Sequence, residues 1–170
     1  AFKVSKTSDY KAKYPTTILD APTSYRDWVW QIIVDGNDNP IVAMVRISGD
    51  KKSHQYYYAR WNGNSWKLTD LANGGGKFHP SNTEHCYSGG MALDEANFNN
   101  VYLSIPTQSE STGTKVYEIW KYTVDDNGNV TNKEQVTKNS LKNNVRPFVL
   151  PGSGVSKLRV CWSPGGYDYL

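Results

Sequence analysis

Short runs of alternating apolar and polar residues, separated by turn-forming residues, dominate the chain. In its first part these runs span residues 28–34, 40–48, 54–61 and 65–69. Alternation with a period of two is typical of strands, and Gly- and Asn-containing turns connect antiparallel neighbours. No stretch of ten or more residues has the sustained i, i+3, i+4 apolar spacing of a helix. The pattern therefore predicts an antiparallel four-stranded meander over residues 27–72.

A similar pattern returns further along the chain. Runs at 88–93, 100–105, 115–124 and 130–137 predict a second meander within residues 84–138, and two more strands predict a partial third within 144–170. Asp35 and Asp94 occupy equivalent positions in the first two copies. One copy is too small to bury its own apolar faces, so we expect the copies to stack side by side as blades of a β-propeller.

The predicted fold class is all-β: a single β-propeller region over residues 1–170, with two full antiparallel four-stranded blades plus parts of others. Residues 1–26 are expected to be a lead-in that could supply one outer strand. Because these elements cannot complete a ring, we expect a fragment of a larger propeller, with self-association or a missing remainder covering its exposed apolar faces and strand edges. A compact β-sandwich of about ten strands is the alternative.

Composition narrows the function classes. The chain has 170 residues, of which 38% are hydrophobic and 13% aromatic, as expected of a folded domain. Its net charge of +3 comes from 19 basic and 16 acidic residues spread along the chain, which argues against a nucleic-acid partner. No apolar run approaches the ~20 residues of a membrane span, so no membrane partner is expected.

No cofactor is expected either. Cys86 and Cys161 are too few for a disulfide scaffold. A metal site built from His79, His85 and Cys86 would fit no zinc signature, so we predict no metal.

The run from His54 to Trp61 is the first candidate site. A strand places His54, Tyr56, Tyr58 and Arg60 on one face. Arginine pairs with a carboxylate, histidine can take a proton near neutral pH and tyrosine can donate one, which together suit a sugar acid. In the alternative interpretation the tyrosines fill the gap between blades and Arg60 covers a surface.

Three further candidates lie at predicted strand entrances or near the chain end. His85 and Tyr87 precede the first strand of the second meander, where Gly89 and Gly90 would let a backbone or a sugar approach closely. Arg146 lies at the matching place in the third copy, as a clamp for an anionic ring or as a brace between blades. Trp162 and Tyr167 could form an aromatic platform for sugars, although Trp162 could equally be core.

Several catalytic signatures are missing. The sequence holds no Gly-x-Ser-x-Gly elbow, P-loop or Rossmann fingerprint. Asp35 and Asp94 lie where a strand enters a turn, so we expect them to cap the backbone rather than to serve as paired catalytic carboxylates.

The order and spacing of the motifs resemble the C-terminal part of the neuraminidase-like BNR repeat proteins of bacteria. The residues that carry this resemblance are Arg26-Asp27-Trp28-Val29-Trp30, His54-x-Tyr56-Tyr57-Tyr58-Ala59-Arg60-Trp61, Glu84-x-x-Tyr87-Ser88-Gly89-Gly90-x-Ala92-Leu93-Asp94, Val101-Tyr102-Leu103-Ser104, Glu118-Ile119-Trp120, Asn144-x-Arg146-Pro147 and Trp162-x-x-Gly165-x-Tyr167.

This resemblance implies a secreted or periplasmic propeller of seven or eight blades that acts on polysaccharides or oligosaccharides. Related proteins include lyases of ulvan and other uronate polysaccharides and some α-L-rhamnosidases. The matching catalytic residues would be His54 as base or acid partner, Tyr87 as proton donor and Arg146 as the carboxylate clamp. The residues expected to contact substrate are Tyr56, Arg60, His85, Trp162 and Tyr167.

The sequence also departs from the family pattern. Ile105 stands where a basic residue is expected, the family's N-terminal blades have no counterpart here, and the full Asp-box motif Ser-x-Asp-x-Gly-x-x-Trp does not occur. Sialic acid is therefore a poor candidate ligand. Three functions follow as hypotheses. The leading one is β-elimination of an acidic polysaccharide, and the alternatives are hydrolysis of the α-L-rhamnosidase type and sugar binding without catalysis.

Overall fold

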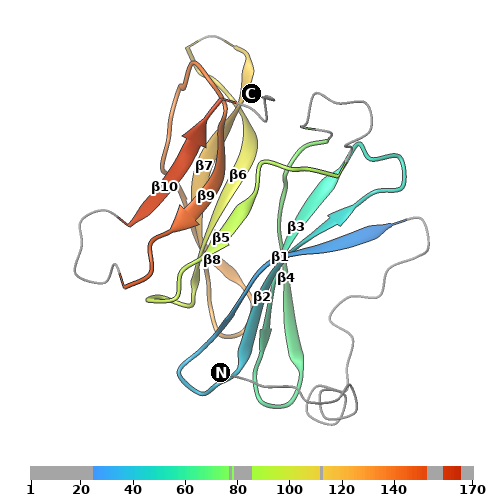
Figure 1. The fold of residues 1–170 in the computed structure, drawn as a ribbon, viewed down its shortest axis with the longest axis vertical. Coiled ribbons are helices and arrows are strands. Elements are labelled where there is room, and N and C mark those ends of the chain that lie inside the picture. Colours follow the sequence, from blue (N-terminus) through green and yellow to red (C-terminus); the bar gives the residue numbers. More distant parts are fainter. Residues whose placement is uncertain (1–24, 77, 79–85, 112, 153–158, 166–170) are drawn as a thin grey trace.

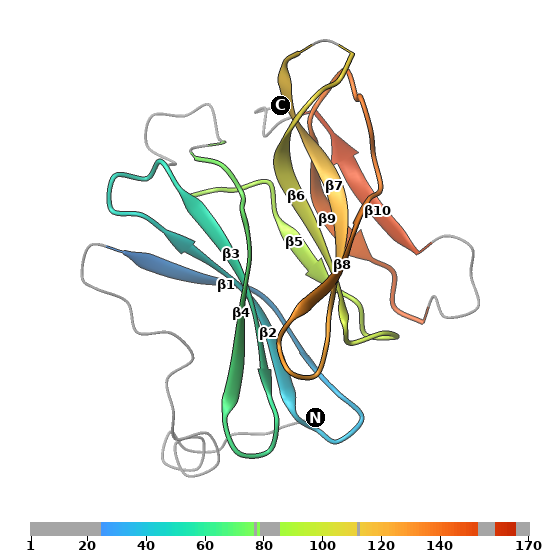
Figure 2. The same ribbon diagram turned by 180° about the vertical axis from the view of Figure 1, so that it is seen from behind.

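The computed structural model describes residues 25–76, 78, 86–111, 113–152 and 159–165, and the described residues contain strands and no helix. The strands form three antiparallel sheets (Figures 1 and 2). The first sheet contains β1 (Arg26–Val34), β2 (Pro40–Ile47), β3 (His54–Trp61) and β4 (Trp66–Asn73). The second contains β5 (Met91–Leu93), β6 (Asn100–Gln108), β7 (Lys115–Val124) and β8 (Val130–Gln135). The third is a hairpin of β9 (Asn144–Val149) and β10 (Val160–Pro164).

The predicted all-β class and the antiparallel four-stranded sheets are confirmed. In both full sheets the spatial order of the strands follows the chain, β1-β2-β3-β4 and β5-β6-β7-β8. Because every neighbour follows directly in sequence, short turns connect the strands and each sheet is a meander. Among the described residues, no helix is long and apolar enough to cross a membrane.

Aspartates shape three of the strand-to-strand turns. The Oδ1 atom of each accepts two backbone N–H bonds from residues two to four positions ahead, which fixes the turn as an Asx turn. The donors are Asn37 and Asn39 for Asp35 (2.9 and 3.0 Å), Ala96 and Asn97 for Asp94 (3.0 and 3.2 Å), and Asn127 and Asn129 for Asp125 (2.9 and 2.8 Å). The expectation that Asp35 and Asp94 cap the backbone is confirmed.

A bulge in β1 sets which side chains face the second sheet. The pairing of β1 with β2 shifts between Val29 and Gln31, so Trp30 is the extra residue of the bulge and the alternation resumes at Gln31. Trp28 before the bulge and Ile33 after it therefore point to the same face, although they are five positions apart in sequence. The other face carries Val29, Ile32 and Val34, and the last two pair with Val42 and Pro40.

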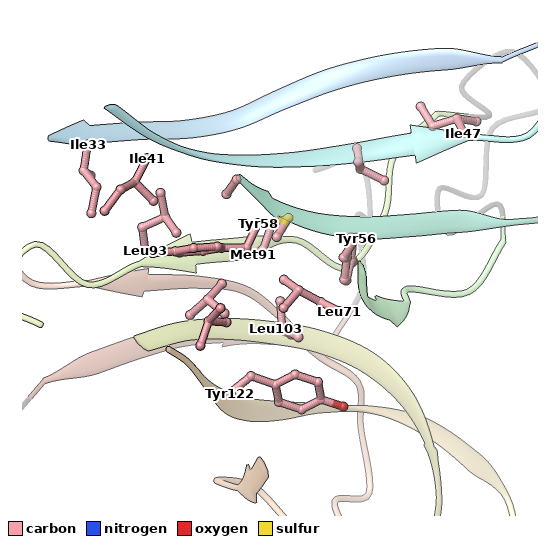
Figure 3. Close-up of a cluster of buried hydrophobic side chains, with 14 of the residues drawn as sticks. Ile33, Ile41, Ile47, Tyr56, Tyr58, Leu71, Met91, Leu93, Leu103 and Tyr122 are labelled. Atoms are coloured by element: carbon pink, nitrogen blue, oxygen red, sulfur yellow. The ribbon is translucent and has the colours of Figure 1, made fainter. Parts of the chain in front are cut away.

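The main core lies between the first two sheets (Figure 3). From the first sheet it takes alternate residues of β2 and β3, which a strand directs to one side. Its members include Ile41, Val45, Ile47, Tyr56, Tyr58, Leu93, Val101 and Leu103, none of which is more than 1% exposed. The face of β3 that was predicted to carry a site therefore packs on the second sheet, and Tyr56 and Tyr58 fill the space between the two sheets.

The first strands of the three sheets lie next to one another. β5 contacts β1 on one side and β9 on the other, and all three residues of β5 are buried. Among the described strands, the first strand of another sheet contacts β1 on one side, where β5 lies, and likewise contacts β9 on the side of β5. Large apolar side chains are accordingly exposed on both: Val29 (58%), Ile32 (60%) and Val34 (48%) on β1, and Phe148 (53%) on β9.

Tyr56 joins the two sheets by more than its apolar area. Its hydroxyl group donates to the carbonyl oxygen of Ser104 (3.1 Å) and accepts from the backbone N–H of Gly90 (3.0 Å). A side chain at Gly74 would overlap the Tyr56 ring, and one at Gly89 would overlap the Ser104 hydroxyl. The two glycines therefore allow the close approach that these hydrogen bonds require.

Replacing Tyr56 by Phe tests this connection. The substitution keeps the ring but leaves the Gly90 N–H and the Ser104 carbonyl buried without this partner, which should lower the free energy of unfolding by about 1–3 kcal/mol. Urea denaturation followed by tryptophan fluorescence measures it. Tyr25→Phe is the matched control, because Tyr25 is 41% exposed, and its stability should change by less than about 0.5 kcal/mol. Equal effects of the two substitutions would contradict the role of the Tyr56 hydroxyl.

Candidate functional site

Aromatic and cationic side chains from three parts of the chain meet where β1, β5 and β9 come together. Trp28 and Trp30 come from β1, Tyr87 from the segment before β5, and Arg146 from β9. The Tyr87 ring meets the Trp28 ring edge-on, with 5.8 Å between centroids and an interplanar angle of 88°. The guanidinium carbon of Arg146 lies 5.9 Å from the centroid of Trp30, within the range of a cation–π contact. We call these four residues the rim cluster.

Glycine brings β9 close enough to form the cluster. The backbone N–H of Arg146 donates to the carbonyl oxygen of Gly89 (2.6 Å). A Cβ atom at Gly90 would lie 3.3 Å from the Cα atom of Arg146, and Gly90 has a φ of 100°, which only glycine adopts readily. The expectation that this glycine pair admits a neighbouring backbone is confirmed. Arg146 itself has a φ of 54°, in the left-handed region where larger residues are strained.

The rim cluster is open to solvent. Trp28 is 38% exposed and Arg146 is exposed, while Trp30 and Tyr87 are half-buried. The indole Nε1 of Trp30 is buried and has no hydrogen-bond partner among the described residues. Aromatic rings of this kind, combined with a few polar groups, are typical of ligand sites.

The structure brings together two of the three residues that the sequence predicted to be catalytic. Tyr87 and Arg146 both belong to the rim cluster. His54 is in the core with no exposed surface. Its backbone N–H donates to Gly75 and its carbonyl oxygen accepts from Gly74, both at 2.7 Å, so it ties the start of β3 to the segment after β4.

The predicted substrate-contacting residues are scattered. Tyr56 lies in the main core, with its hydroxyl bonded as described above. Trp162 packs with a second apolar cluster around Ala92, Tyr102 and Ile119, between the second sheet and the β9–β10 hairpin. His85 and Tyr167 lie outside the described residues.

Sequence reasoning did not select Trp28 and Trp30 as site residues, although it quoted them in a family motif. The usable signal is two tryptophans at i and i+2 on one strand, which places both on the same face. Their contacts with Tyr87 and Arg146 depend on how three sheets meet, and no local pattern contains that information.

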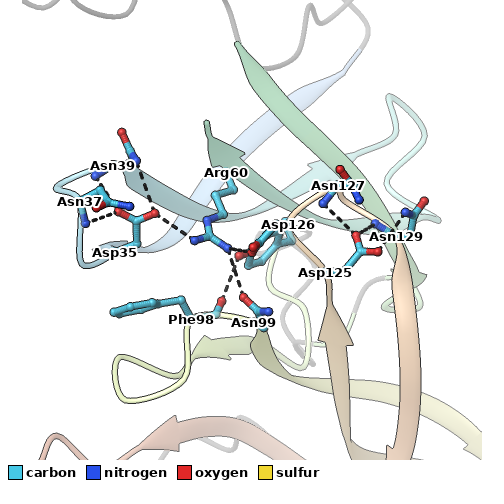
Figure 4. A network of polar contacts seen from close by, with 11 residues as sticks. Asp35, Asn37, Asn39, Arg60, Phe98, Asn99, Asp125, Asp126, Asn127 and Asn129 are labelled. Carbon is cyan, nitrogen blue, oxygen red and sulfur yellow. Dashed lines mark hydrogen bonds and ion pairs between the residues drawn. The ribbon is translucent and has the colours of Figure 1, made fainter. Parts of the chain in front are cut away.

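Arg60 belongs to a polar network at the other end of the first sheet (Figure 4). Its Nη2 atom lies 3.0 Å from Oδ2 of Asp35, and its Nη1 atom lies 2.5 Å from Oδ1 of Asp126 and 3.1 Å from Oδ1 of Asn99. Asn99 and Asp126 belong to the second sheet's turns. Arg60 therefore connects the β1–β2 turn of its own sheet to the second sheet.

The network shifts the pKa values of its members. Burial raises the pKa of Asp35, but hydrogen bonds from the N–H groups of Asn39 and Asn37 and from Arg60 outweigh it, and the pKa is lowered overall. Burial raises the pKa of Tyr58, the neighbour of Arg60 on the same face, to about 12. Tyr58 therefore keeps its proton, which it donates to the carbonyl oxygen of Phe98 (2.9 Å).

A separate hollow of about 400 Å³ lies beside Tyr25, Arg46 and Tyr57. Arg46 is held there by Asp27 in a two-pronged ion pair, with N–O distances of 2.9 and 3.0 Å. Its charge is thereby neutralised within the protein. In the described part of the chain, no group of three His, Cys, Asp or Glu side chains is arranged to hold a metal ion.

Replacing Arg60 by Gln should lower stability in a pH-dependent way. Side-chain exposure is 17% for Arg60 and 3% for Asp35, so the pair is more than a surface contact, and we expect a loss of about 2 kcal/mol at pH 7. Because the folded pKa of Asp35 is lowered, its stabilisation is complete above the unfolded value of about 3.9 and is lost as the pH falls through the folded value.

The measurement is urea denaturation of wild type and Arg60→Gln at neutral pH and at successive values below about 3.9. The difference between the two proteins should shrink in acid. A difference that is independent of pH would show that Arg60 acts through packing of its side chain instead.

Comparison with known proteins matches the first part of the chain to a protein family. Residues 4–74, which include the whole first sheet, match a family described as BNR repeat-containing family member. No curated protein and no solved structure gives a match to the chain. The match covers the first sheet and supports a resemblance of that part of the chain to BNR-repeat proteins.

Proposed function

We propose that the chain forms consecutive blades of a β-propeller and that its rim cluster binds an acidic glycan. The observation that carries the proposal is that β1 contacts both other parts of the rim cluster, Tyr87 through Trp28 and Arg146 through Trp30. Loops and strand ends that converge in this way are where folds of stacked sheets carry their ligand sites.

The burial of the first strands supports the propeller. β5 has a neighbouring sheet on each side and is buried throughout. Among the described elements, β1 and β9 each contact one neighbouring four-stranded sheet, and they expose Ile32, Val34 and Phe148. Exposed apolar strips at equivalent strands are the expected surface where a further sheet of the same kind packs in a stack of repeats.

The chemistry of the rim cluster suits a sugar acid. An indole or phenol ring offers an apolar face against which the C–H face of a sugar ring can pack, and its polar edge stays in water. A guanidinium group pairs with a carboxylate through two parallel hydrogen bonds. Trp28 and Tyr87 would hold the ring, and Arg146 would select for an acidic group.

The geometry favours binding over bond cleavage. Tyr87 is the rim-cluster residue that could donate a proton, but none of the four residues is a histidine or a carboxylic acid that could act as the matching base. His54, the predicted base, has no exposed surface. β-Elimination and rhamnoside hydrolysis stay predictions from the resemblance, and both are assayed below.

Calorimetric titration with a uronate oligosaccharide tests binding. Trp28→Ala and Arg146→Gln should each weaken it about tenfold, or by about 1.4 kcal/mol, and Arg146→Gln should reduce the preference over a neutral oligosaccharide of equal length. Leu68→Ala is the control, because Leu68 is exposed on β4 away from the cluster. Binding that is unchanged in both rim variants would contradict the proposal.

The same mixtures distinguish the catalytic alternatives. Absorbance from an unsaturated uronate would support β-elimination, and free rhamnose without that absorbance would support hydrolysis. If wild type forms either product and a folded His54→Ala variant does not, the corresponding reaction would replace binding as the proposed function.

The packing proposal predicts self-association of the isolated chain. Sedimentation velocity should show a mass that rises with concentration, and Ile32→Lys should reduce it because a charge then sits on the exposed strip of β1. Leu141→Lys is the matched control, since Leu141 is 90% exposed outside that strip. Monomers at every concentration in the wild type would argue that these faces do not attract a second sheet.

A further inference from the structure

We infer that the glycan site continues along β1 to Arg26, so that one ligand chain is held by two cationic ends, Arg26 and Arg146, with the aromatic residues between them. The ligand class is then an oligosaccharide with acidic groups on at least two non-adjacent sugars. This inference rests on the proposed function and adds to it a second acidic subsite and a minimum ligand length.

The contacts of β1 place the residues in this order. Arg26 and Trp28 pair with Ile47 and Val45 of β2, two positions apart, and so lie on the same face of the strand. Nη1 of Arg26 lies 3.7 Å from Sγ of Cys86, and the next residue, Tyr87, meets Trp28.

Trp30 completes the row. The bulge after Val29 leaves Trp30 packed against the main core, where its ring meets both Gly90 and Arg146. Along β1 the order is therefore a cation, an aromatic pair, a second aromatic ring and a second cation. We call this row the β1 strip.

The length of the β1 strip determines what it can hold. Arg26 and Trp30 are four residues apart, which is about 13 Å at the usual rise of a strand, slightly less with the bulge. A single sugar ring is shorter than this separation. Acidic groups on two sugars that are separated by a third therefore match the spacing of the two ends, with the middle sugar against the rings of Trp28 and Tyr87.

Arg26 is also electrostatically available for a ligand. It is exposed, and no described carboxylate forms an ion pair with it. Its chain neighbour Asp27 is directed to the opposite face of the strand, where Arg46 holds it at 2.9 Å. Arg46, Arg60 and Arg159, in contrast, are each paired with an aspartate of the protein.

The test compares ligand lengths in matched variants. A uronate monosaccharide, disaccharide and tetrasaccharide are titrated into wild type, Arg26→Gln, Arg26→Lys and Lys67→Gln at low and high salt. Lys67 is exposed on β4 and is the charge-matched control. Circular dichroism confirms that each variant is folded.

We expect wild type to bind the tetrasaccharide at least tenfold more tightly than the monosaccharide. Arg26→Gln should remove most of that gain and weaken the salt dependence, because one ion pair fewer forms. It should leave monosaccharide binding within about twofold, and Arg26→Lys should restore part of the gain because the charge is kept. Lys67→Gln should behave like wild type.

Three results would overturn the inference. If Arg26→Gln leaves the tetrasaccharide unaffected while the monosaccharide still binds, the second subsite is wrong and the proposed function stands. If Arg26→Gln weakens all lengths equally, Arg26 supports the fold of the first site rather than a second acidic group. If a single-stranded oligodeoxythymidine binds more tightly than the tetrasaccharide, the β1 strip binds nucleic acid, whose bases stack on aromatic rings and whose phosphates pair with cationic groups. Absence of binding to any uronate in wild type would instead contradict the proposed function.

Discussion

The contact between the first strand of one sheet and the first strand of the next is the constraint on which the structure depends. β5 is only three residues long, yet each of its side chains is buried because β1 and β9 lie on either side. Burial of apolar area is the dominant favourable term in folding, and a single meander in this chain has too little of it on one face alone. Tyr56 adds a directional link, since its hydroxyl bonds to both a strand and the segment before β5 of the second sheet.

Polar contacts at the turns fix how the sheets are oriented. Two interfaces join consecutive sheets. At each one, the residue just before the second strand of the later sheet contacts the first turn of the earlier sheet, either directly or through another side chain. Asn99 does so through Arg60, which in turn holds Asp35, and Arg159 reaches Asp94 directly at 2.5 Å. The same aspartates shape their turns, so each carboxylate serves both local structure and sheet packing. Removing one partner of a partly buried charge pair leaves the other charge uncompensated, so both pairs disfavour arrangements that separate the sheets at these turns.

The rim cluster is a consequence of this packing. Tyr87, Trp28 and Arg146 are far apart in sequence, and their approach follows from the hydrogen bond between the backbones of Arg146 and Gly89. A site assembled from strands that the core already holds in place loses little conformational entropy when a ligand binds. This is the physical reason to expect the ligand at the rim rather than along the polar outer strand β8, whose side chains are mostly exposed.

The sequence alone determined where the strands lie and, in large part, which of their residues share a face. Alternation predicted the two meanders, turn chemistry predicted the capping roles of Asp35 and Asp94, and the period of two assigned His54, Tyr56 and Tyr58 to one face, because each of these depends on residues only a few positions apart. Only the tertiary structure decided that this face is the core, which buries His54 and Tyr56, and that Arg60 is committed to Asp35. The tertiary structure also brought Trp28 to Tyr87 and Trp30 to Arg146, since the bulge in β1 and the packing of three sheets act between residues that no local pattern connects.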